Sequence, residues 1–475
     1  MYTKGKKVLK TVLCIVLALA IVVGGALGYL LTGVKPVVEE PRQIETENGV
    51  LKVGILSDMQ LTADGEDKYS QNYKKALELF KSQNVNVILN IGDFTDVLTK
   101  EAMENHKSLF DSVYSESERE QLSLSYIFGN HDYWLPYFVD CWEIPFTRKM
   151  HNRFTECTYA ESPWTHKVVN GYHFIAVSPD SGGMSGDAYS EKTLQWAEEQ
   201  IQAAVADNPQ LPVFVLTHHN PEGTVYTSKN NGCENLDELF KKYPQVVSFS
   251  GHSHAPLMDE AAIYQKEYTA INTQCTSYVC FAEDANCIVH DDGSFIEDNP
   301  MVMIMELKGS QATVQRYSVL DGKAQKSPWI IDAAAGKDGF AYTDARKAQS
   351  AAPVWSDDFT ISAQSVQVGE ENTPACQLTF TAAQHTDMVR QYRAVFKQNN
   401  EPVSIALGDK TFDSLTLISD FSLPAEQRNE KMVFNLPAEK YQASIPAGQY
   451  TVELYAQDAF GNESAPQTAQ LEIAY

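Results

Sequence analysis

Basic residues are scarce in this chain of 475 residues, which has 37 Lys and Arg against 62 Asp and Glu and a formal net charge of −25. Proteins that bind a nucleic-acid polymer neutralise its phosphates with Lys and Arg, so this charge balance argues against such a partner. It also argues against broad adhesion to an anionic membrane surface. A composition with 43% apolar residues excludes a disordered or fibrous chain, and the length predicts two or three domains.

Cysteine is also sparse, with eight residues in the whole chain. None of them shows CxxC spacing, which argues against a zinc knuckle, and a chain of this size needs no disulfide scaffold. Cys275, Cys280 and Cys287 are close enough in sequence for one local disulfide. Buried free thiols are an equally good interpretation.

Charged residues are absent from Thr11 to Val34, a run of 24 mostly apolar positions. About 20 such residues suffice to span a bilayer. Four lysines precede the run and no acidic residue occurs in 1–35, which predicts a cytoplasmic N-terminus. We therefore expect residues 1–35 to form a basic cytoplasmic segment and a transmembrane anchor, with the bulk of the chain outside the cell. The alternative is cleavage as a signal peptide, which would give a secreted protein.

The remainder of the chain divides by its periodicity. Residues 36–49 are polar with two prolines and predict a linker. From 50 to 320, apolar runs of strand length alternate with stretches of helical periodicity, which predicts an α/β domain. Residues 321–352 are rich in Gly, Ala and Lys and are expected to be a connector. In 353–475 the period changes to two, which predicts a C-terminal all-β sandwich.

Five predicted strands of the α/β region end in residues of metal-ligand type. In chain order these ends are Asp58-Met59-Gln60, Gly92-Asp93-Phe94-Thr95-Asp96, Gly129-Asn130-His131-Asp132, Thr217-His218-His219-Asn220 and Gly251-His252-Ser253-His254. Ligands of α/β sheets bind beyond the carboxyl ends of the strands, so the five loops are expected to converge. Each motif alone is weak evidence for metal binding, but the ordered set of five predicts a metal site. Its mixture of oxygen and nitrogen donors suits Mn, Fe or Zn.

The order D-x-(H), GDxxD, GNHD, H and GHxH resembles that of the calcineurin-like metallophosphoesterases, over roughly residues 50–320. The resemblance implies a four-layer α/β/β/α sandwich with two metal ions at the loops of the sheet edge. It implies that one carboxylate bridges both ions and that three further residues are ligands of each ion. The implied ligands are Asp93 as the bridge, Asp58, Gln60 and His254 for one ion, and Asn130, His218 and His252 for the other.

The same resemblance implies the activity and the residues that assist it. A hydroxide held between the two ions would attack a phosphomonoester or phosphodiester. His131 would protonate the leaving oxygen, and Asp96 would orient its imidazole. Asp132 is at least as well explained as a cap of its loop. His219 is explained equally well as a support for the ligands or as a packing residue.

The first motif departs from the family pattern because Gln60 stands where His is common. An amide oxygen donates less well to a metal than imidazole does. This leaves open a catalytically weak or silent metal-binding scaffold that presents the sandwich as an adhesin or receptor. The C-terminal region resembles fibronectin type III or Ig-like modules through its YTVELYAQDAFGN run, and such modules bind wall polymers or protein partners.

Aromatic residues are dense between residues 132 and 164. They are Tyr133, Trp134, Tyr137, Phe138, Trp142, Phe146, Phe154, Tyr159 and Trp164. One interpretation is an aromatic wall beside the metals that stacks a base or a sugar ring. The other, which we favour, is a small local core.

Overall fold

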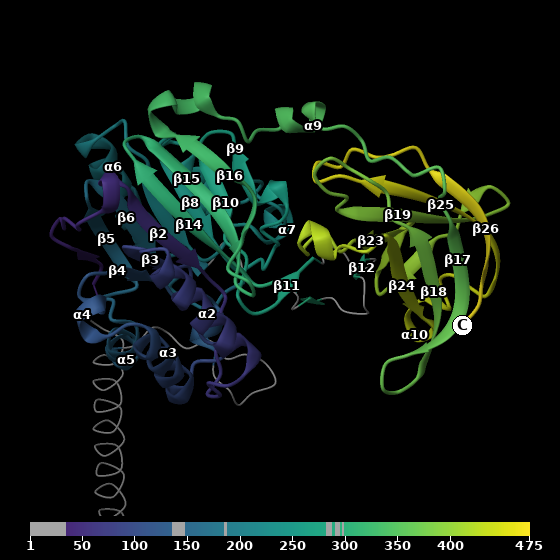
Figure 1. Ribbon diagram of the computed structural model, residues 1–475, viewed down its shortest axis with the longest axis horizontal. Coiled ribbons are helices and arrows are strands. Elements are labelled where there is room, and N and C mark those ends of the chain that lie inside the picture. The colour runs from purple at the N-terminus through teal and green to yellow at the C-terminus, as the bar shows by residue number, and fades with distance from the viewer. Residues whose placement is uncertain (1–34, 135–147, 185–187, 282–286, 290–294, 297–298) are drawn as a thin grey trace, which may run out of the picture.

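The computed structural model describes residues 35–134, 148–184, 188–281, 287–289, 295–296 and 299–475. The predicted membrane anchor lies outside these residues. Within the described ranges, no helix has both the length and the apolar character needed to cross a membrane. Figure 1 shows two parts, a larger α/β part and a C-terminal β-rich part.

Two mixed sheets form the centre of the α/β part (Figure 1). The first, in spatial order, consists of β1 (Val37–Val38), β5 (Trp164–Val169), β6 (Tyr172–Val177), β7 (Val213–Thr217), β8 (Val246–Ser250), β10 (Thr269–Asn272) and β9 (Ile263–Gln265). The second consists of β16 (Ala324–Asp332), β15 (Gln311–Ser318), β14 (Met301–Lys308), β2 (Leu51–Leu56), β3 (Val87–Asn90) and β4 (Ser123–Tyr126). Apolar residues of both sheets share one buried core, so the sheets pack face to face.

Helices cover the outer face of each sheet. The helices on the second sheet are α2 (Lys68–Ser82), α3 (Lys100–Val113) and α5 (Arg148–Thr158), and those on the first are α6 (Glu191–Asp207) and α8 (Glu234–Phe240). Each of the two helix–sheet interfaces has its own apolar core. The predicted α/β fold is therefore confirmed, with layers in the order helices, sheet, sheet, helices.

The helix starts follow from local chemistry. Asp67, Thr99 and Ser190 precede α2, α3 and α6, and each side chain accepts a hydrogen bond from a backbone N–H of the first turn. Such caps satisfy donors that a helix cannot pair internally. Short helical turns at η1 (Glu47–Gly49), α4 (Glu116–Arg119), η2 (His131–Tyr133), α7 (Ser228–Asn231) and η4 (Glu260–Ala262) connect the longer elements.

The strand directions bring the predicted site loops together. β2, β3 and β4 run parallel in the second sheet, and β6, β7 and β8 run parallel in the first. The carboxyl ends of parallel strands meet at the same edge of a sheet. The loops after β2, β3, β4, β7 and β8 therefore leave the sheets from neighbouring strand ends.

Residues 324–332 differ from the prediction of a connector at 321–352. They form β16, which extends the second sheet by pairing with β15. The physical reason is alternation, because Trp329 and Ile331 are buried on the sheet while Ile330 is 51% exposed. The remaining link to the C-terminal part contains η6 (Ala333–Gly339) and α9 (Ala345–Gln349).

The C-terminal part is mostly β, as predicted, and its two sheets enclose one apolar core. The larger sheet consists of β12 (Cys287–Val289), β23 (Leu415–Ile418), β19 (Gln391–Gln398), β25 (Gly448–Gln457) and β26 (Gln467–Ile473), with β20 (Glu401–Pro402) beside β19. The smaller consists of β17 (Ile361–Val368), β18 (Thr373–Thr381) and β24 (Lys431–Pro437). The remaining elements are β21 (Ile405–Leu407), β22 (Lys410–Phe412), η7 (Ala425–Gln427) and α10 (Ala438–Tyr441). The likeness to fibronectin or Ig-like modules stays a prediction.

The segment between β10 and β14 connects the two parts. It contains β11 (Val279–Cys280), which pairs with β13 (Phe295–Ile296), and β12, which pairs with β23 of the C-terminal sheet. Cys275, Cys280 and Cys287 of this segment are free thiols in the structure, so no local bridge joins them.

Candidate metal centre

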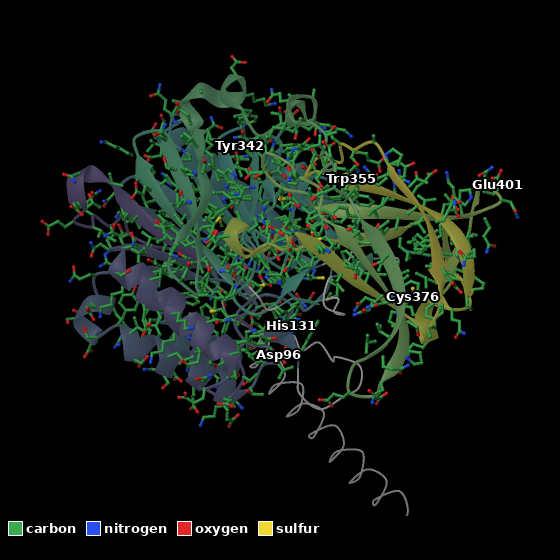
Figure 2. The ribbon with its side chains drawn as sticks, turned by 45° about the vertical axis from the view of Figure 1, so that its right-hand side comes forward. Asp96, His131, Tyr342, Trp355, Cys376 and Glu401 are labelled. Carbon is green, nitrogen blue, oxygen red and sulfur yellow. The ribbon has the colours of Figure 1, made fainter. Side chains whose placement is uncertain are left out.

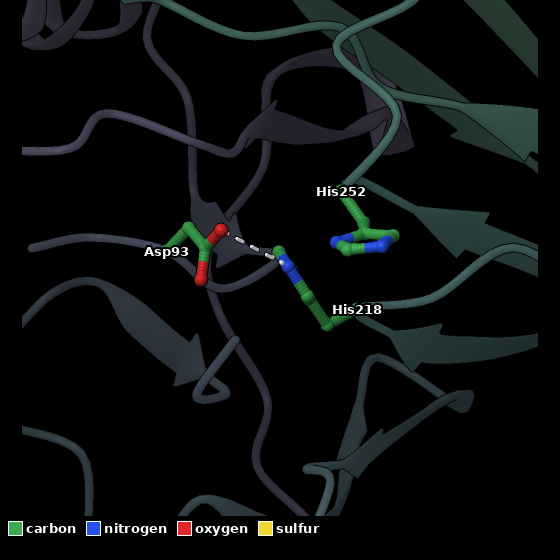
Figure 3. A group of neighbouring side chains, drawn as sticks. All are labelled: Asp93, His218 and His252. Carbon is green, nitrogen blue, oxygen red and sulfur yellow. Dashed lines mark ion pairs between the residues drawn. The ribbon is translucent and has the colours of Figure 1, made fainter. Parts of the chain in front are cut away.

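Asp93 lies at the centre of the predicted site. It follows β3 and is 1% exposed, and its Oδ2 atom lies 3.2 Å from Nε2 of His218 (Figure 3). The Nδ1 atom of His218 donates to the backbone oxygen of Ile91 at 2.9 Å, which turns Nε2 toward Asp93. His252 lies on the other side of His218, with 5.2 Å between the two ring centroids.

The charges of this group are tightly linked. Burial disfavours the charge on Asp93, but the neighbouring imidazoles of His218 and His131 hold the pKa of Asp93 below its ordinary value. Burial likewise lowers the pKa of His218, and the charge of Asp93 outweighs it and raises that pKa to about 9. For His252, burial dominates and lowers the pKa to about 4. Asp93 and His218 thus favour each other's charged forms in a buried setting.

Asp58 and His254 form a second group beside the first. The Oδ1 atom of Asp58 lies 3.3 Å from Nε2 of His254, and both side chains are buried. The Nδ1 atom of His254 donates to the backbone oxygen of Tyr278 at 2.7 Å, which again fixes the ring with Nε2 inward. The backbone N–H of His252 donates to both Asp58 oxygens, at 3.0 and 3.2 Å, and so ties the two groups together.

Asn130 faces the first group. Its Oδ1 atom lies 3.1 Å from Nε2 of His218 and 2.9 Å from Nδ1 of His252. An amide oxygen between two imidazoles is a suitable donor for the same cation. Asn130 therefore lies where the sequence predicts it, although the ligand role itself remains a proposal.

Gln60 lies at the edge of the second group. Its Nε2 atom is 3.4 Å from Nε2 of His131 and 3.4 Å from the hydroxyl of Tyr278, while its Oε1 accepts from Ser277 Oγ at 3.3 Å. The amide oxygen is thus directed at Ser277 in the structure. Gln60 is in the predicted place, and its contacts are with the proposed acid and the 277–278 loop.

Donor atoms in these groups meet the spacing that a metal needs. Within the described residues, Asp93, His218 and His252 each offer a donor atom, and these atoms lie within 4.8 Å of one another. Asp58, Asp93 and His254 meet the same condition. Both groups combine carboxylate oxygen with imidazole nitrogen and share Asp93, so the residues present fit two adjacent cations.

The backbone of the site is strained in a regular way. Positive φ occurs at Asp58 (49°), Gln60 (49°), Asp93 (49°), His252 (64°) and His254 (51°). Non-glycine residues rarely adopt this region, and such strain concentrates at functional sites. The five side chains are directed inward at a cost that the surrounding fold must offset.

Glycines complete the cradle around the donors. A Cβ added to Gly129 would collide with Asp93 and His218, and one added to Gly251 would collide with Asp58. The glycines of the GNHD and GHxH motifs are therefore needed for close approach.

His131 and Asp96 lie beside each other (Figure 2). The Nδ1 atom of His131 donates to the backbone oxygen of Asp96 at 2.8 Å and lies 3.6 Å from its carboxylate. Burial lowers the pKa of His131, but the charge of Asp93 and the hydrogen bonds with Asp96 raise it above its ordinary value. The His131 side chain is 19% exposed and that of Asp96 is 52% exposed, so this pair can be reached from solvent.

Asp132 and His219 are both held by hydrogen bonds within the protein. Asp132 is buried and accepts from Thr95 N–H at 2.9 Å, Thr95 Oγ1 at 2.8 Å and Gly129 N–H at 2.9 Å, so it caps two site loops. His219 uses Nε2 to contact the backbone oxygen of Gly183 at 2.9 Å, and its Nδ1 lies 3.3 Å from the hydroxyl of Tyr189. Both ring nitrogens of His219 are therefore engaged within the protein.

The aromatic cluster divides between core and site. Tyr133 and Phe154 are fully buried in the helix–sheet core, as the local-core interpretation requires. Trp134 instead lies over His131, with 4.0 Å between ring centroids. The predicted contributors Tyr137, Phe138, Trp142 and Phe146 lie outside the described residues.

Residues 51–256 match the family model of calcineurin-like phosphoesterases. All nine predicted site residues, from Asp58 to His254, fall inside the matched range. No curated protein matches the chain.

A comparison with solved structures gives matches at low sequence identity. Vacuolar protein sorting 29 from Cryptosporidium parvum is 12% identical over 60% of this chain and 100% of that one, with a TM-score of 0.29. Purple acid phosphatase PPD1 from yellow lupin seeds is 13% identical over 60% of this chain and 54% of that one, with a TM-score of 0.37. A predicted phosphoesterase from Streptococcus pneumoniae is 9% identical over 60% and 98%, with a TM-score of 0.26. At these identities and scores, the neighbours add no argument to the family match.

Tyr278 is one residue of the site that the sequence does not reveal. Its ring lies over His254, with 4.3 Å between centroids, and its hydroxyl contacts Gln60. It belongs to no strand-end motif and has no periodic signal. Its proximity arises because residues 273–278 fold back across the loops that carry Asp58 and His254.

Proposed function

We propose that the protein is a metal-dependent hydrolase of a phosphomonoester or phosphodiester, with two metal ions, that acts on the outer face of a membrane. The observation that carries the proposal is the pair of donor groups that share Asp93. A carboxylate common to both groups is what two adjacent cations require. The family match of residues 51–256 supports the reaction class.

Each of the two donor groups would bind one ion. Asp58 and His254 would hold one ion and Asn130, His218 and His252 the other, with Asp93 shared and Gln60 at the edge. Ions bound there would lower the pKa of a water and offset negative charge on the phosphate oxygens. Mn, Fe and Zn all suit this donor set.

The chain itself supplies the proton for the leaving group. Because Nδ1 of His131 donates to Asp96, Nε2, which lies 3.4 Å from the Gln60 amide nitrogen, is the ring nitrogen that would hold a proton toward the substrate. The charge of Asp93 and the hydrogen bonds with Asp96 raise the pKa of His131 above its ordinary value, which favours the protonated imidazole. The backbone N–H of His131 also donates to Asp93 at 2.9 Å, so the acid and the shared carboxylate keep a fixed relation.

A small or locally presented phosphoester fits this chain better than a polyanion. The net charge of −25 repels an extended polyanion, whereas two cations would concentrate positive charge at one site. The membrane location rests on the uncharged run at 11–34 and its preceding lysines. Protease digestion of intact cells tests it: the proposal expects the C-terminal bulk to be cut from outside while residues before the run are protected.

Hydrolysis by the purified protein tests the activity. A chain starting at residue 36 retains β1 and is assayed with Mn²⁺ against nitrophenyl phosphate and bis-nitrophenyl phosphate. The proposal expects hydrolysis of at least one ester, its loss in Asp93→Asn, and a large reduction in His131→Ala. Two bound ions without hydrolysis of any phosphoester tried would contradict the catalytic claim.

That contradicting result would support the second candidate, a metal-binding scaffold that presents the sandwich. The observation in its favour is Gln60, whose oxygen contacts Ser277. Binding of cell wall or of a protein partner through residues 353–475 would then be the property to measure. The contacts of His131 with Asp96 argue against it, because a scaffold needs no proton donor.

A further inference from the structure

We propose that the C-terminal sandwich positions one half of the metal centre, the half formed by Asp58 and His254, by holding residues 273–281 in place. The inference rests on the proposed two-metal site and extends it to the C-terminal part. The sandwich is then a working part of the site and not a separable module.

Residues 273–278 hold Asp58 in place through hydrogen bonds to its backbone oxygen and to the side chain of Ser57. Ser277 Oγ donates to the backbone oxygen of Asp58 at 2.8 Å. Ser57 Oγ contacts the Asp58 carboxylate, lies 2.7 Å from Thr273 Oγ1 and is within 2.6 Å of the backbone oxygen of Gln274. Each of these groups is buried, so a displaced segment would leave polar atoms near Asp58 without partners.

The following residues hold His254. The backbone oxygen of Tyr278 accepts from Nδ1 of His254, and the Tyr278 ring covers the imidazole. The backbone N–H of Cys280 donates to the backbone oxygen of His254 at 3.0 Å. Tyr278 therefore sets the orientation of this imidazole, since the partner of the outer nitrogen fixes the inner one, and Cys280 holds the backbone of His254.

A relay of hydrogen bonds runs from the same segment into the sandwich. Gln274 Nε2 donates to the backbone oxygen of Asn299 at 2.8 Å. Asn299 Nδ2 in turn donates to the backbone oxygen of Ser422 at 2.8 Å. All three residues are buried, so water does not readily replace either bond.

Aromatic and charged contacts reinforce the relay. The Phe281 ring meets Phe421 of the sandwich edge-on, with 5.5 Å between centroids. The backbone oxygen of Phe281 accepts from the Tyr226 hydroxyl at 3.1 Å, and Arg390 of the sandwich lies over the Tyr226 ring. Arg390 Nε also lies 2.5 Å from Asp259, which is fully buried five residues beyond His254.

The segment then becomes part of the C-terminal sheet. β12 pairs in parallel with β23, and Figure 1 shows it beside that strand. Ile288 of β12 is buried in the apolar core of the sandwich. Residues 273–281 are thus held between the metal centre and a sheet edge that belongs to the sandwich.

The other half of the centre is held by the α/β part. His218 Nδ1 donates to Ile91 at the end of β3, and the backbone N–H of His218 donates to the Tyr189 hydroxyl at 3.0 Å. Asn130 contacts His218 and His252 directly. Loosening the junction with the sandwich is therefore expected to weaken the binding of one ion and leave the binding of the other unchanged.

Calorimetric titration of the full-length, detergent-solubilised protein with Mn²⁺ alone tests the inference. The variants are Asn299→Ala, which removes the donor to Ser422, and Phe421→Ala, which removes the ring against Phe281. The matched control is Asn462→Ala, because Asn462 Nδ2 also donates from the sandwich to backbone oxygens outside it, those of Lys347 and Ser350 in the link that contains α9. We expect two sites in the parent and the control, and a roughly 10- to 100-fold loss at one site only in the two variants.

Hydrogen exchange in the metal-free protein provides a second readout, at the amide of Cys280. It is expected to exchange faster in Asn299→Ala and Phe421→Ala than in the parent or in Asn462→Ala. Unchanged exchange in folded variants overturns the inference, as does an equal loss at both Mn²⁺ sites together with a general fall in thermal stability. A parent protein that binds fewer than two ions contradicts the proposed function instead. The exchange rate of the Cys280 amide then still tests whether the sandwich holds residues 273–281 in place.

Discussion

Asp93 and His131 are joined by one hydrogen bond, from the backbone N–H of His131 to Oδ1 of Asp93 at 2.9 Å. The other oxygen of Asp93 lies 3.2 Å from His218. One carboxylate therefore connects the proposed proton donor with both proposed metal positions. Any change that moves Asp93 is expected to affect metal binding and proton transfer together.

Replacing His131 tests the proton donor. His131→Ala is expected to lower kcat about 10²- to 10⁴-fold, the usual contribution of general acid catalysis, with Mn²⁺ binding retained. The matched control is His385→Ala, because His385 lies in the C-terminal part and is expected to leave kcat unchanged. A normal kcat in His131→Ala would assign the proton to another group.

The pH profile tests the role of Asp96. The acid must be protonated to act, so the rate falls as pH rises through the pKa of His131. Asp93 and Asp96 together raise that pKa against the effect of burial. Asp96→Asn removes part of this support, so the alkaline limb of kcat is expected at lower pH than in the parent. An unmoved limb would mean that the carboxylate of Asp96 does not act on His131.

Replacing Gly129 tests whether the close approach of the backbone to Asp93 and His218 is needed for metal binding. In Gly129→Ala the added methyl group would collide with Asp93 and His218, so Mn²⁺ binding and hydrolysis are expected to be lost while the far-ultraviolet circular dichroism stays native. Gly309→Ala is the control, because its φ of 58° is unfavourable for alanine but its surroundings are open. The control is expected to cost about 1 kcal/mol of stability with metal binding intact.

Asp132 tests the capping of the site loops. Its carboxylate accepts three hydrogen bonds from Thr95 and Gly129, all buried. Asp132→Ala leaves those donors unpaired, and each buried unpaired group costs about 1–3 kcal/mol. Urea unfolding is expected to show a loss in that range or above, with a smaller loss for Asp132→Asn. Equal stability of parent and Asp132→Ala would rule out the capping role.

His106 predicts a pH dependence of stability away from the site. It is fully buried in the helix–sheet core, and burial lowers its pKa from 6.5 to about 4. The unfolded chain therefore binds this proton more readily, so stability is complete above about pH 6.5 and falls as pH drops toward 4, by roughly 3 kcal/mol from this residue. His106→Gln is expected to flatten that part of the urea-unfolding profile, and an unchanged slope between pH 4 and 6.5 would contradict the assignment.

Much of the fold and the site was predictable because both depend on local patterns. The hairpin at Asn170-Gly171, the helix from Glu191 and the strand at Val213 follow turn, cap and burial signals that act over a few residues. The nine site residues come together because each follows a strand whose direction the α/β alternation already implies. Asp93 and His254 lie in the predicted groups for that reason.

The remaining features depend on contacts between distant segments. The sequence predicts a connector at 321–352 because this stretch is rich in Gly, Ala and Lys, whereas pairing with β15 makes 324–332 a strand on which Trp329 is buried. Tyr278 and Asn299 carry no motif, and their roles arise from the packing of two domains. The contact of the Gln60 amide oxygen with Ser277 likewise depends on residues 273–278, which are distant in sequence.

The most direct test of the shared carboxylate is electron paramagnetic resonance of the Mn²⁺-loaded protein. Two donor groups that share Asp93 predict two bound ions per chain with the signal of an exchange-coupled pair, and Asp93→Asn is expected to lose that coupling. Saturation with only isolated Mn²⁺ signals, or with a single ion per chain, would contradict the account.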